Sequence, residues 1–474
     1  MRAEAPLFGL GLHSKSPNVT SNKLINAYYE FQKNPDRTSV AIYGTPGLTL
    51  FLDQGDTPWR GLHVVDNTMY GVHRGTFYSI TNAAVATARG TIGTTSGKVG
   101  ICDDGTLITV VDGSEIYTYD TTSPATPIAA VADADRPTSP NTCVFQGGRI
   151  LTDENGTSQF KGSELYDNTD WDALDFATAE SNPDNLIRVI NYRGTVVLFG
   201  QYTTEFWSNI GGSGFPYTKV LQADVEYGLD ARWSVAPFAG TFAFLATNRE
   251  GQVIVSVLNG YSTPTRISNF ELENEINSYA TTGDASGFGY MLGGHPMYQL
   301  NFPTESKTWL YDGSTQYWSE LQYNSGERHR AELSVDFLGK TIVSDYENGK
   351  IYKLESEALT DNGMDIHMIL SGKHIFNQKK KVRFTRLELG LESGVGLVTG
   401  QGSEPVAGLR ISKDGGNSFG AETYARMGKQ GEYTKRCIWR NLGSGRDIVP
   451  QITITDPVKR VITDCTLIIE DGLS

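Results

Sequence analysis

The sequence predicts an all-β protein, made of a β-propeller of about seven blades and a smaller C-terminal β-sandwich that serves as a platform domain. Short runs of β-branched and aromatic residues alternate with turn residues along most of the chain, whereas long helical patterns are scarce. The 52 glycines, 23 tyrosines and 20 phenylalanines suit many short strands joined by tight turns. At 474 residues, the chain also exceeds what one hydrophobic core usually organises, unless the fold is a repeat.

The clearest repeat unit lies between Phe288 and Leu321. It holds four strand-like runs, separated by Gly-Gly-His-Pro, Pro-Thr-Glu-Ser and Asp-Gly-Ser-Thr-Gln. These are turn residues, because Gly allows positive φ, Pro fixes φ, and Asp and Ser bond their own backbone. Four adjacent strands in fewer than about forty residues are the size of one propeller blade.

Residues 1–55 show little periodicity and are expected to form an N-terminal arm. Their best strand is Ser39–Tyr43, and a second candidate, Leu48–Leu52, follows after a Thr-Pro-Gly turn. An N-terminal strand can complete the last blade of a propeller. We therefore expect this arm to close the ring and to contact neighbouring molecules.

Blade-like units fill residues 56–370. The first tight turn of each unit falls at Asn67, Gly105, Gly147, Gly194, Gly240, Gly294 and Gly339. The intervals are 38, 42, 47, 46, 54 and 45 residues, in agreement with propeller repeats of about 40–50 residues. Seven blades are favoured, and counts of six and eight stay open because the units share little sequence identity.

Two segments between the units predict other features. Asp167–Asn185 is acidic, and Trp171, Leu174 and Phe176 are expected to anchor it onto neighbouring structure. Ser268–Glu271 matches a capping box and is followed by apolar residues at helical spacing. A short helix capped by Ser268 is therefore expected.

Residues 371–474 predict the β-sandwich. Five runs have alternating apolar positions: Arg383–Leu391, Ala407–Ser412, Thr434–Arg440, Pro450–Ile454 and Arg460–Glu470.

Charge divides the chain in the same way. From Ile375 onward there are 15 Lys and Arg against 11 Asp and Glu, or +4, whereas the preceding residues hold 25 against 43, or −18. Tight binding of nucleic acid needs a basic surface, because neutralisation of phosphates supplies most of the affinity. The acidic part is therefore expected to repel DNA.

No pattern of catalytic or metal-binding residues stands out. The seven histidines form no H-x-x-x-H or H-E-x-x-H set, and no G-x-S-x-G nucleophile motif occurs. The four cysteines have no C-x-x-C spacing and are expected to be free thiols. We therefore expect no enzymatic activity, no metal and no cofactor.

One dense basic run is a candidate contact for another subunit or partner. It comprises Lys379, Lys380, Lys381, Arg383 and Arg386. The run is read either as the solvated start of a strand or as a contact for an acidic neighbour in an assembly.

An Asp-box pattern, S-x-D-x-G-x-[ST]-[WF], occurs at Ser412, Asp414, Gly416, Ser418 and Phe419. The Asp side chain can bond turn amides, and glycine permits a tight hairpin. Glycosidase propellers repeat this box from blade to blade, whereas here one good copy lies outside the propeller. A structural hairpin is the favoured interpretation.

Several pieces of the sequence, taken in order, carry a family resemblance: Trp171–Glu180, Leu198–Gly200, Thr203–Trp207, Trp233–Ala236, Asn259–Tyr261, Arg266–Ser268, Gly294–His295, Phe302–Pro303, Thr308–Asp312, Cys437–Arg440, Gly445–Asp447 and Asp456–Val458. They cover roughly residues 165–474 and resemble the packaged-DNA stabilisation proteins of short-tailed phages, also called tail hub or tail nozzle proteins.

The resemblance implies a structural protein of the phage tail. Such proteins combine a propeller with a platform-like β domain and assemble as a sixfold ring below the portal and adaptor. The ring retains packaged DNA, often with a needle or tip protein as plug and with fibres or spikes attached, and later conducts the DNA during ejection without sequence-specific binding. Met1–Ser16 lacks the apolar core of a signal peptide, so synthesis in the host cytoplasm is expected.

Two other classes of function stay open. The Asp box and the many aromatic residues suggest a host-surface propeller that binds or cleaves glycans. An intracellular scaffold that binds partners through propeller loops is the plainer alternative.

Overall fold

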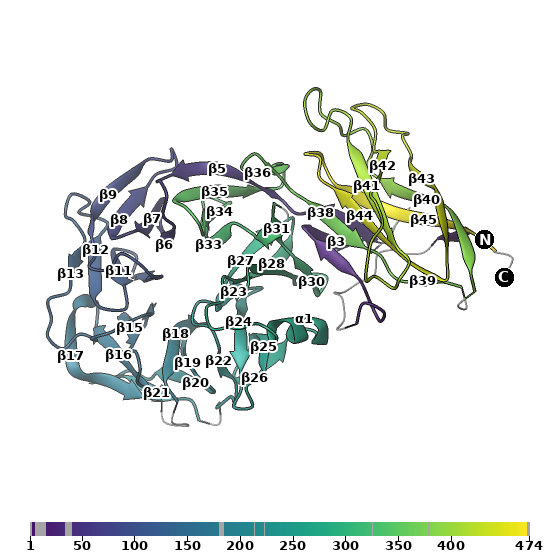
Figure 1. Cartoon of the computed structure of the whole chain (residues 1–474). Coiled ribbons are helices and arrows are strands. Elements are labelled where there is room, and N and C mark those ends of the chain that lie inside the picture. The colour runs from purple at the N-terminus through teal and green to yellow at the C-terminus, as the bar shows by residue number, and fades with distance from the viewer. Residues whose placement is uncertain are drawn as a thin grey trace.

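The computed structural model describes residues 2–4, 16–33, 40–179, 184–212, 214–221, 223–324, 326–377 and 380–471. Figure 1 shows a ring of small sheets beside a two-layered sandwich. One α-helix, α1 (Phe270–Ile276), lies in these ranges, so the described fold is almost entirely β. In the same ranges, no helix has the length and apolar character needed to cross a membrane.

The first half of the ring is made of four sheets, each of four strands in sequence order. Their strands are β6 (Trp59–Val65), β7 (Thr68–His73), β8 (Thr76–Ile80) and β9 (Ala86–Thr91); β10 (Gly100–Asp103), β11 (Leu107–Val111), β12 (Ile116–Asp120) and β13 (Ala129–Ala130); β14 (Cys143–Gln146), β15 (Arg149–Asp153), β16 (Gln159–Glu164) and β17 (Asp167–Thr178); and β18 (Leu186–Tyr192), β19 (Thr195–Gly200), β20 (Thr204–Asn209) and β21 (Tyr217–Lys219).

Three further sheets follow in the ring. They contain β22 (Gly228–Leu229), β23 (Ala236–Phe238), β24 (Thr241–Thr247), β25 (Val253–Asn259) and β26 (Ser262–Arg266); β27 (Ser286–Leu292), β28 (His295–Phe302), β29 (Lys307–Asp312) and β30 (Tyr317–Glu320); and β33 (Ala331–Phe337), β34 (Lys340–Asp345), β35 (Lys350–Glu355), β5 (Gly47–Asp53), β36 (Thr360–Asp361) and β37 (Met364–Asp365). A small hairpin, β31 (Gln322–Tyr323) and β32 (Glu327–Arg328), lies between the last two sheets.

The sheets stack face to face, so strands in their middle are buried on both sides. All six residues of β19 are buried, and its Phe199 packs on Phe244 of the next sheet with ring centroids 5.0 Å apart. A strand that loses both faces to solvent reads as a continuous apolar run, here Val196–Phe199. This is why the blade strands are visible in the sequence.

The sandwich has two sheets. The first contains β3 (Ala27–Phe31), β4 (Val40–Gly44), β45 (Val461–Asp471), β40 (Val382–Leu391) and β43 (Cys437–Gly445), with β1 (Arg2–Glu4) also paired to β45; the second contains β2 (Lys23–Ile25), β38 (Met368–Ser371), β44 (Asp447–Ile454), β41 (Val406–Ser412) and β42 (Thr423–Arg426), with β39 (Ile375–Phe376) also paired to β44. Leu387, Leu409 and Ile452 belong to the apolar core between them. All four cysteines are free thiols, as expected.

The N-terminal strands join the two domains. β2 pairs in parallel with β30 and antiparallel with β38, so one ten-stranded sheet runs from the propeller into the sandwich. β5 pairs with β35 and extends the last sheet of the ring. Residues expected to form a single arm therefore supply strands to both domains, and Ser39 of that arm lies outside the described residues.

The expectation that Leu174 anchors the acidic segment was wrong. Residues 167–178 form the long strand β17, in which Trp171 is buried but Leu174 is 77% exposed and Phe176 is 37% exposed. The reason is position, since β17 is the last strand of its sheet and has a neighbour, β16, on one side only.

The N-cap of helix α1 is one residue later than the predicted Ser268. Asn269 is the N-cap, and its side chain accepts a 2.9 Å hydrogen bond from the amide of Leu272. Ser268 instead bonds the carboxylate of Glu273, at 2.6 Å. The Glu273 carboxylate lies within the helix, and it engages the serine that would otherwise serve as the cap. The strand predicted from Thr434 also starts later, at Cys437.

Candidate functional site

The predicted basic run lies where β40 begins. Lys380, Lys381 and Arg383 are exposed to solvent, while Lys379 lies outside the described residues. Arg386 forms an ion pair with Glu388, two residues further along β40. The structure therefore leaves three of the predicted cations open to solvent and neutralises the fourth.

The basic surface continues from β40 onto β43. Arg386 lies directly opposite Arg440 in the strand register, and Glu388 also accepts bonds of 2.6 and 2.7 Å from Arg436. The bond from Arg436 lowers the pKa of Glu388. Burial raises this pKa, but Arg386 lowers it further, so the pKa is lowered overall. Sequence reasoning missed Arg436 and Arg440, although the alternation along β43 places Arg440 on an outward face.

The Asp box forms the hairpin between β41 and β42. Asp414 accepts bonds from the Ser418 hydroxyl at 2.5 Å, the Ser418 amide at 2.9 Å and the Ser412 hydroxyl at 2.7 Å. These bonds hold the pKa of the Asp414 carboxyl well below its usual range. The Ser412 hydroxyl in turn accepts from the Gly416 amide at 2.8 Å, and Phe419 is half-buried at the end of the box.

The hairpin faces residues 16–22 of the N-terminal segment. A Cβ on Gly415 would lie 2.0 Å from Oδ1 of Asn18, and the φ of 74° at Gly415 also favours glycine. His374 lies beside the same segment, with its Nε2 2.7 Å from the carbonyl of Pro17 and its Nδ1 2.6 Å from Asp447. Burial lowers the pKa of His374, but the bonds to Asp447 and Pro17 outweigh burial and raise it overall.

The contact with His374 predicts a pH-dependent N-terminal segment. Because the pKa of His374 is raised on folding, its stabilising effect is complete below its ordinary value of about 6.5 and is lost as pH rises through the raised value. Amide hydrogen exchange in residues 16–22 should therefore quicken with pH more steeply than intrinsic exchange does. His374→Gln should remove the extra slope, and an unchanged slope would contradict this role.

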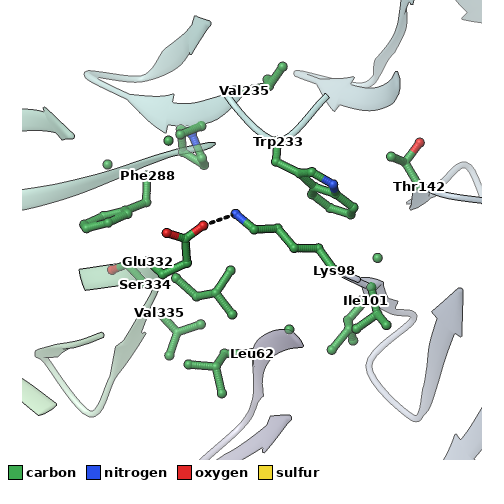
Figure 2. Close-up of a pocket in the computed structure, with 18 of the residues that line it drawn as sticks. Leu62, Lys98, Ile101, Thr142, Trp233, Val235, Phe288, Glu332, Ser334 and Val335 are labelled. Carbon is green, nitrogen blue, oxygen red and sulfur yellow. Dashed lines mark ion pairs between the residues drawn. The ribbon is translucent and has the colours of Figure 1, made fainter. Parts of the chain in front are cut away.

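A pocket, called the axial pocket below, lies at the centre of the ring and is lined by residues from or next to the innermost strand of every sheet. It has a volume of about 380 Å³. Figure 2 shows Lys98 extending across it to Glu332, with 2.5 Å between Lys98 Nζ and Glu332 Oε1. Glu332 also accepts from Arg328 at 2.6 Å and from Ser286 at 2.8 Å. Burial raises the pKa of Glu332, but Lys98 and Arg328 more than offset burial and bring it to about 2.

The Glu332 carboxylate in the axial pocket therefore already has three partners, Lys98, Arg328 and Ser286. Lys98 and Glu332 are more than two hundred residues apart, and no sequence signal pairs them. Among the described residues, no group of three or more His, Cys, Asp or Glu side chains could hold a metal ion.

Solved structures similar to this chain include the WD40 β-propeller domain of Doa1, at 12% identity and a TM-score of 0.40, covering 66% of this chain and 97% of that one. The extracellular domain of the putative hybrid two-component system BT4673 from B. thetaiotaomicron matches at 9% identity and a TM-score of 0.45, covering 74% of this chain and 44% of that one.

A curated relative is the tail hub protein gp10 of Salmonella phage P22. It is 25% identical over 323 residues, and the match covers 64% of each chain. This chain thus spans somewhat less than two thirds of the relative it matches.

Two family models cover almost the whole sequence. The model described as the Bacteriophage P22 Gp10 β-propeller matches residues 7–359, and the model described as the Bacteriophage P22 Gp10 β-sandwich matches residues 367–470. The first reaches well before residue 165, where the resemblance in the sequence began. The fold is a β-propeller followed by a C-terminal β-sandwich, and the chain belongs to the Bacteriophage P22 Gp10 family.

Proposed function

We propose that this protein is a structural subunit of a phage tail hub, located in the virion tail and without enzymatic activity. The observation that carries the proposal is the pair of family matches, which together extend from residue 7 to residue 470. The curated relative is itself a tail hub protein. Because both the propeller and the sandwich match the family, the similarity extends to the whole architecture and is not limited to one domain.

We further propose that six copies assemble as a ring below the portal and adaptor proteins. The lumen of the ring retains packaged DNA and becomes its exit channel, with a needle or tip plug and fibres or spikes attached. Residues 371–474 build much of the ring. Residues 56–370 make inter-subunit or peripheral contacts, and residues 1–55 act as an arm that closes the propeller and contacts neighbours.

The axial pocket supports an assembly of several copies. Its volume of about 380 Å³ is that of a small-molecule site, and Lys98 crosses it to Glu332. A nucleic acid cannot pass through the propeller of one chain, so a conduit needs more than one copy. The formal charge of −14 favours passage, because a surface that bound many phosphates would slow the DNA.

The proposal is tested with particles assembled without this chain. We expect them to package DNA and then to lose it, so that most of the genome becomes accessible to nuclease. Wild-type chain supplied during assembly should restore protection, and antibody to the chain should label the tail. Particles that lack the chain and keep their DNA protected would refute the retention role. Labelling away from the tail would refute the location.

A further inference from the structure

The sandwich has two open sheet edges next to each other. β43 is the last strand of the first sheet, β42 is the last strand of the second, and the two strands are in contact. Figure 1 shows β42 and β43 close together on the upper side of the sandwich. An open edge carries unpaired backbone N–H and C=O groups, which can pair with a strand from another chain. On β42 the carbonyls of Thr423 and Ala425 already accept from the side chains of Trp439 and Cys437, so an extended segment could pair only with the remaining groups of the two edges.

A groove of about 560 Å³ lies between these edges, and its lining is strongly basic. The charged residues that line it are Arg426, Lys435, Arg436, Arg440 and a single acid, Glu432. This is an excess of three positive charges, from four cations against one carboxylate. The groove is thus suited to an acidic partner.

Ion pairs within the chain neutralise part of this excess, because Glu404 lies 3.6 Å from Arg426 and Glu388 pairs with Arg436, but they leave Lys435 and Arg440. Glu388 is shared by Arg386 and Arg436, and Arg440 lies opposite Arg386 in the register. Among the described residues, neither Lys435 nor Arg440 has a carboxylate within ion-pair distance. Like charges opposite one another on a sheet are destabilising, so an added carboxylate here would be favourable.

Two exposed tyrosines, called the tyrosine rim below, are sequence neighbours of residues that line the groove. Tyr424, on β42, is 65% exposed, and Tyr433, in the loop before β43, is 74% exposed. Exposed tyrosines beside arginines have the composition of protein interfaces, where both residue types are enriched.

The propeller presents a surface of opposite character along β17. This strand is the outer edge of its sheet, and Asp167, Asp170 and Asp172 are exposed on it. In the part of the chain that the structure describes, none of these three carboxylates lies within ion-pair distance of a Lys or Arg. Leu174 and Phe176 are exposed further along the same strand. Charge, apolar side chains and a free backbone edge all complement the groove.

We propose that the groove between β42 and β43 of one copy binds strand β17 of a second copy. Asp170 and Asp172 lie against Lys435 and Arg440, and Leu174 and Phe176 are covered by the tyrosine rim. The two surfaces are different patches of one chain, so the contact is head-to-tail, as a ring requires. The inference rests on the proposed function and deepens it, since it names the surfaces by which copies join.

The test measures self-association of the full chain by sedimentation velocity at low salt. The groove variant Lys435→Glu/Arg440→Glu and the strand variant Asp170→Lys/Asp172→Lys should each weaken association about tenfold or more, because each sets like charges against one another. A chain that carries all four substitutions should associate like the wild type. All four residues are exposed, and unchanged thermal unfolding would show that each variant folds.

A matched control is Asp56→Lys/Glu250→Lys, which makes the same change in net charge at exposed sites on sheets of the propeller other than that of β17. It should leave association unchanged. Wild-type chains that associate while the four-residue chain fails to recover would overturn the inference and leave the tail-hub proposal intact. Wild-type chains that stay monomeric would overturn the inference, and the particle experiment would then decide the tail-hub role separately.

DNA is the competing occupant of a basic groove. Fluorescence anisotropy with a labelled duplex distinguishes the two partners. We expect no binding that depends on Lys435 and Arg440. Duplex binding that is lost in the groove variant, together with undisturbed self-association, would overturn the inference and assign the groove to phosphates.

Discussion

Asn26→Leu should lower the free energy of unfolding by about 3 kcal/mol or more. Asn26 is buried where β2 leaves the propeller edge, and its amide group donates to the carbonyls of Gln322 (2.9 Å) and His367 (3.0 Å). Its side-chain oxygen accepts from the Gln322 amide at 2.9 Å. Each partner left unsatisfied costs about 1–3 kcal/mol, with the lower end expected here because the partners are only half-buried.

Backbone conformation adds to this cost, because Asn26 has φ of 52°, a region that asparagine tolerates better than leucine. Asn441→Leu is the matched control, since Asn441 has φ of 57° but is exposed. Denaturant unfolding of both variants separates the two contributions. If Asn26→Leu cost no more than Asn441→Leu, the hydrogen bonds at the domain junction would contribute nothing.

Asp361→Asn should stabilise the protein above pH 7 and leave it unchanged below about pH 4. Asp361 is 3% exposed on β36, beside the closing strand β5, and its Oδ1 has no hydrogen-bond partner among the described residues. Burial raises the pKa of Asp361 from 3.8 to about 7, although Arg460 opposes the change. Burial likewise lowers the pKa of Arg460 to about 10.

The stability of the wild type falls with rising pH because of proton binding at Asp361. The folded state holds the Asp361 proton more tightly than the unfolded state, so the stability from the neutral carboxyl is complete below about pH 4 and is lost as pH rises to about 7. The pKa rises by about three units, and at about 1.4 kcal/mol per unit the loss is on the order of 4 kcal/mol. An asparagine at position 361 cannot ionise, so the variant does not lose this stability.

Thermal unfolding of wild type and variant from pH 4 to 8 measures this difference. Tm of Asp361→Asn should exceed that of the wild type increasingly up to pH 7 and then by a constant amount. Asp56→Asn, at an exposed turn, should show no such trend. A variant less stable than the wild type at pH 8 would mean that the ionised carboxylate and Arg460 stabilise each other there.

Local sequence predicted the site only in part. The Asp box has the hairpin position expected from its glycines and serines, because its bonds join residues at most four apart. The basic run marked Lys380, Lys381 and Arg383 as exposed cations, but its continuation through Arg436 and Arg440 was missed. Those residues join the surface only because β43 lies beside β40, some fifty residues away in the sequence.

The acidic segment shows the limit of composition. Trp171, Leu174 and Phe176 all read as anchors, yet Trp171 alone is buried inside its own chain. Apolar character shows that a side chain gains from burial. It does not tell whether the surface that covers the side chain belongs to the same chain. On an edge strand such as β17, one side has no neighbouring strand of its own sheet to cover it.

The sequence by itself determined the all-β class, the blade-sized units and the alternating strands of the sandwich, because burial on one face or both imposes a pattern along each strand. Only the tertiary structure decided that β2 bridges the two domains, that β5 joins β35 and that Lys98 reaches Glu332. The physical reason is that strand pairing uses backbone groups common to all residues. The sequence pattern shows which face of a strand is buried, but it does not show which distant strand lies beside it.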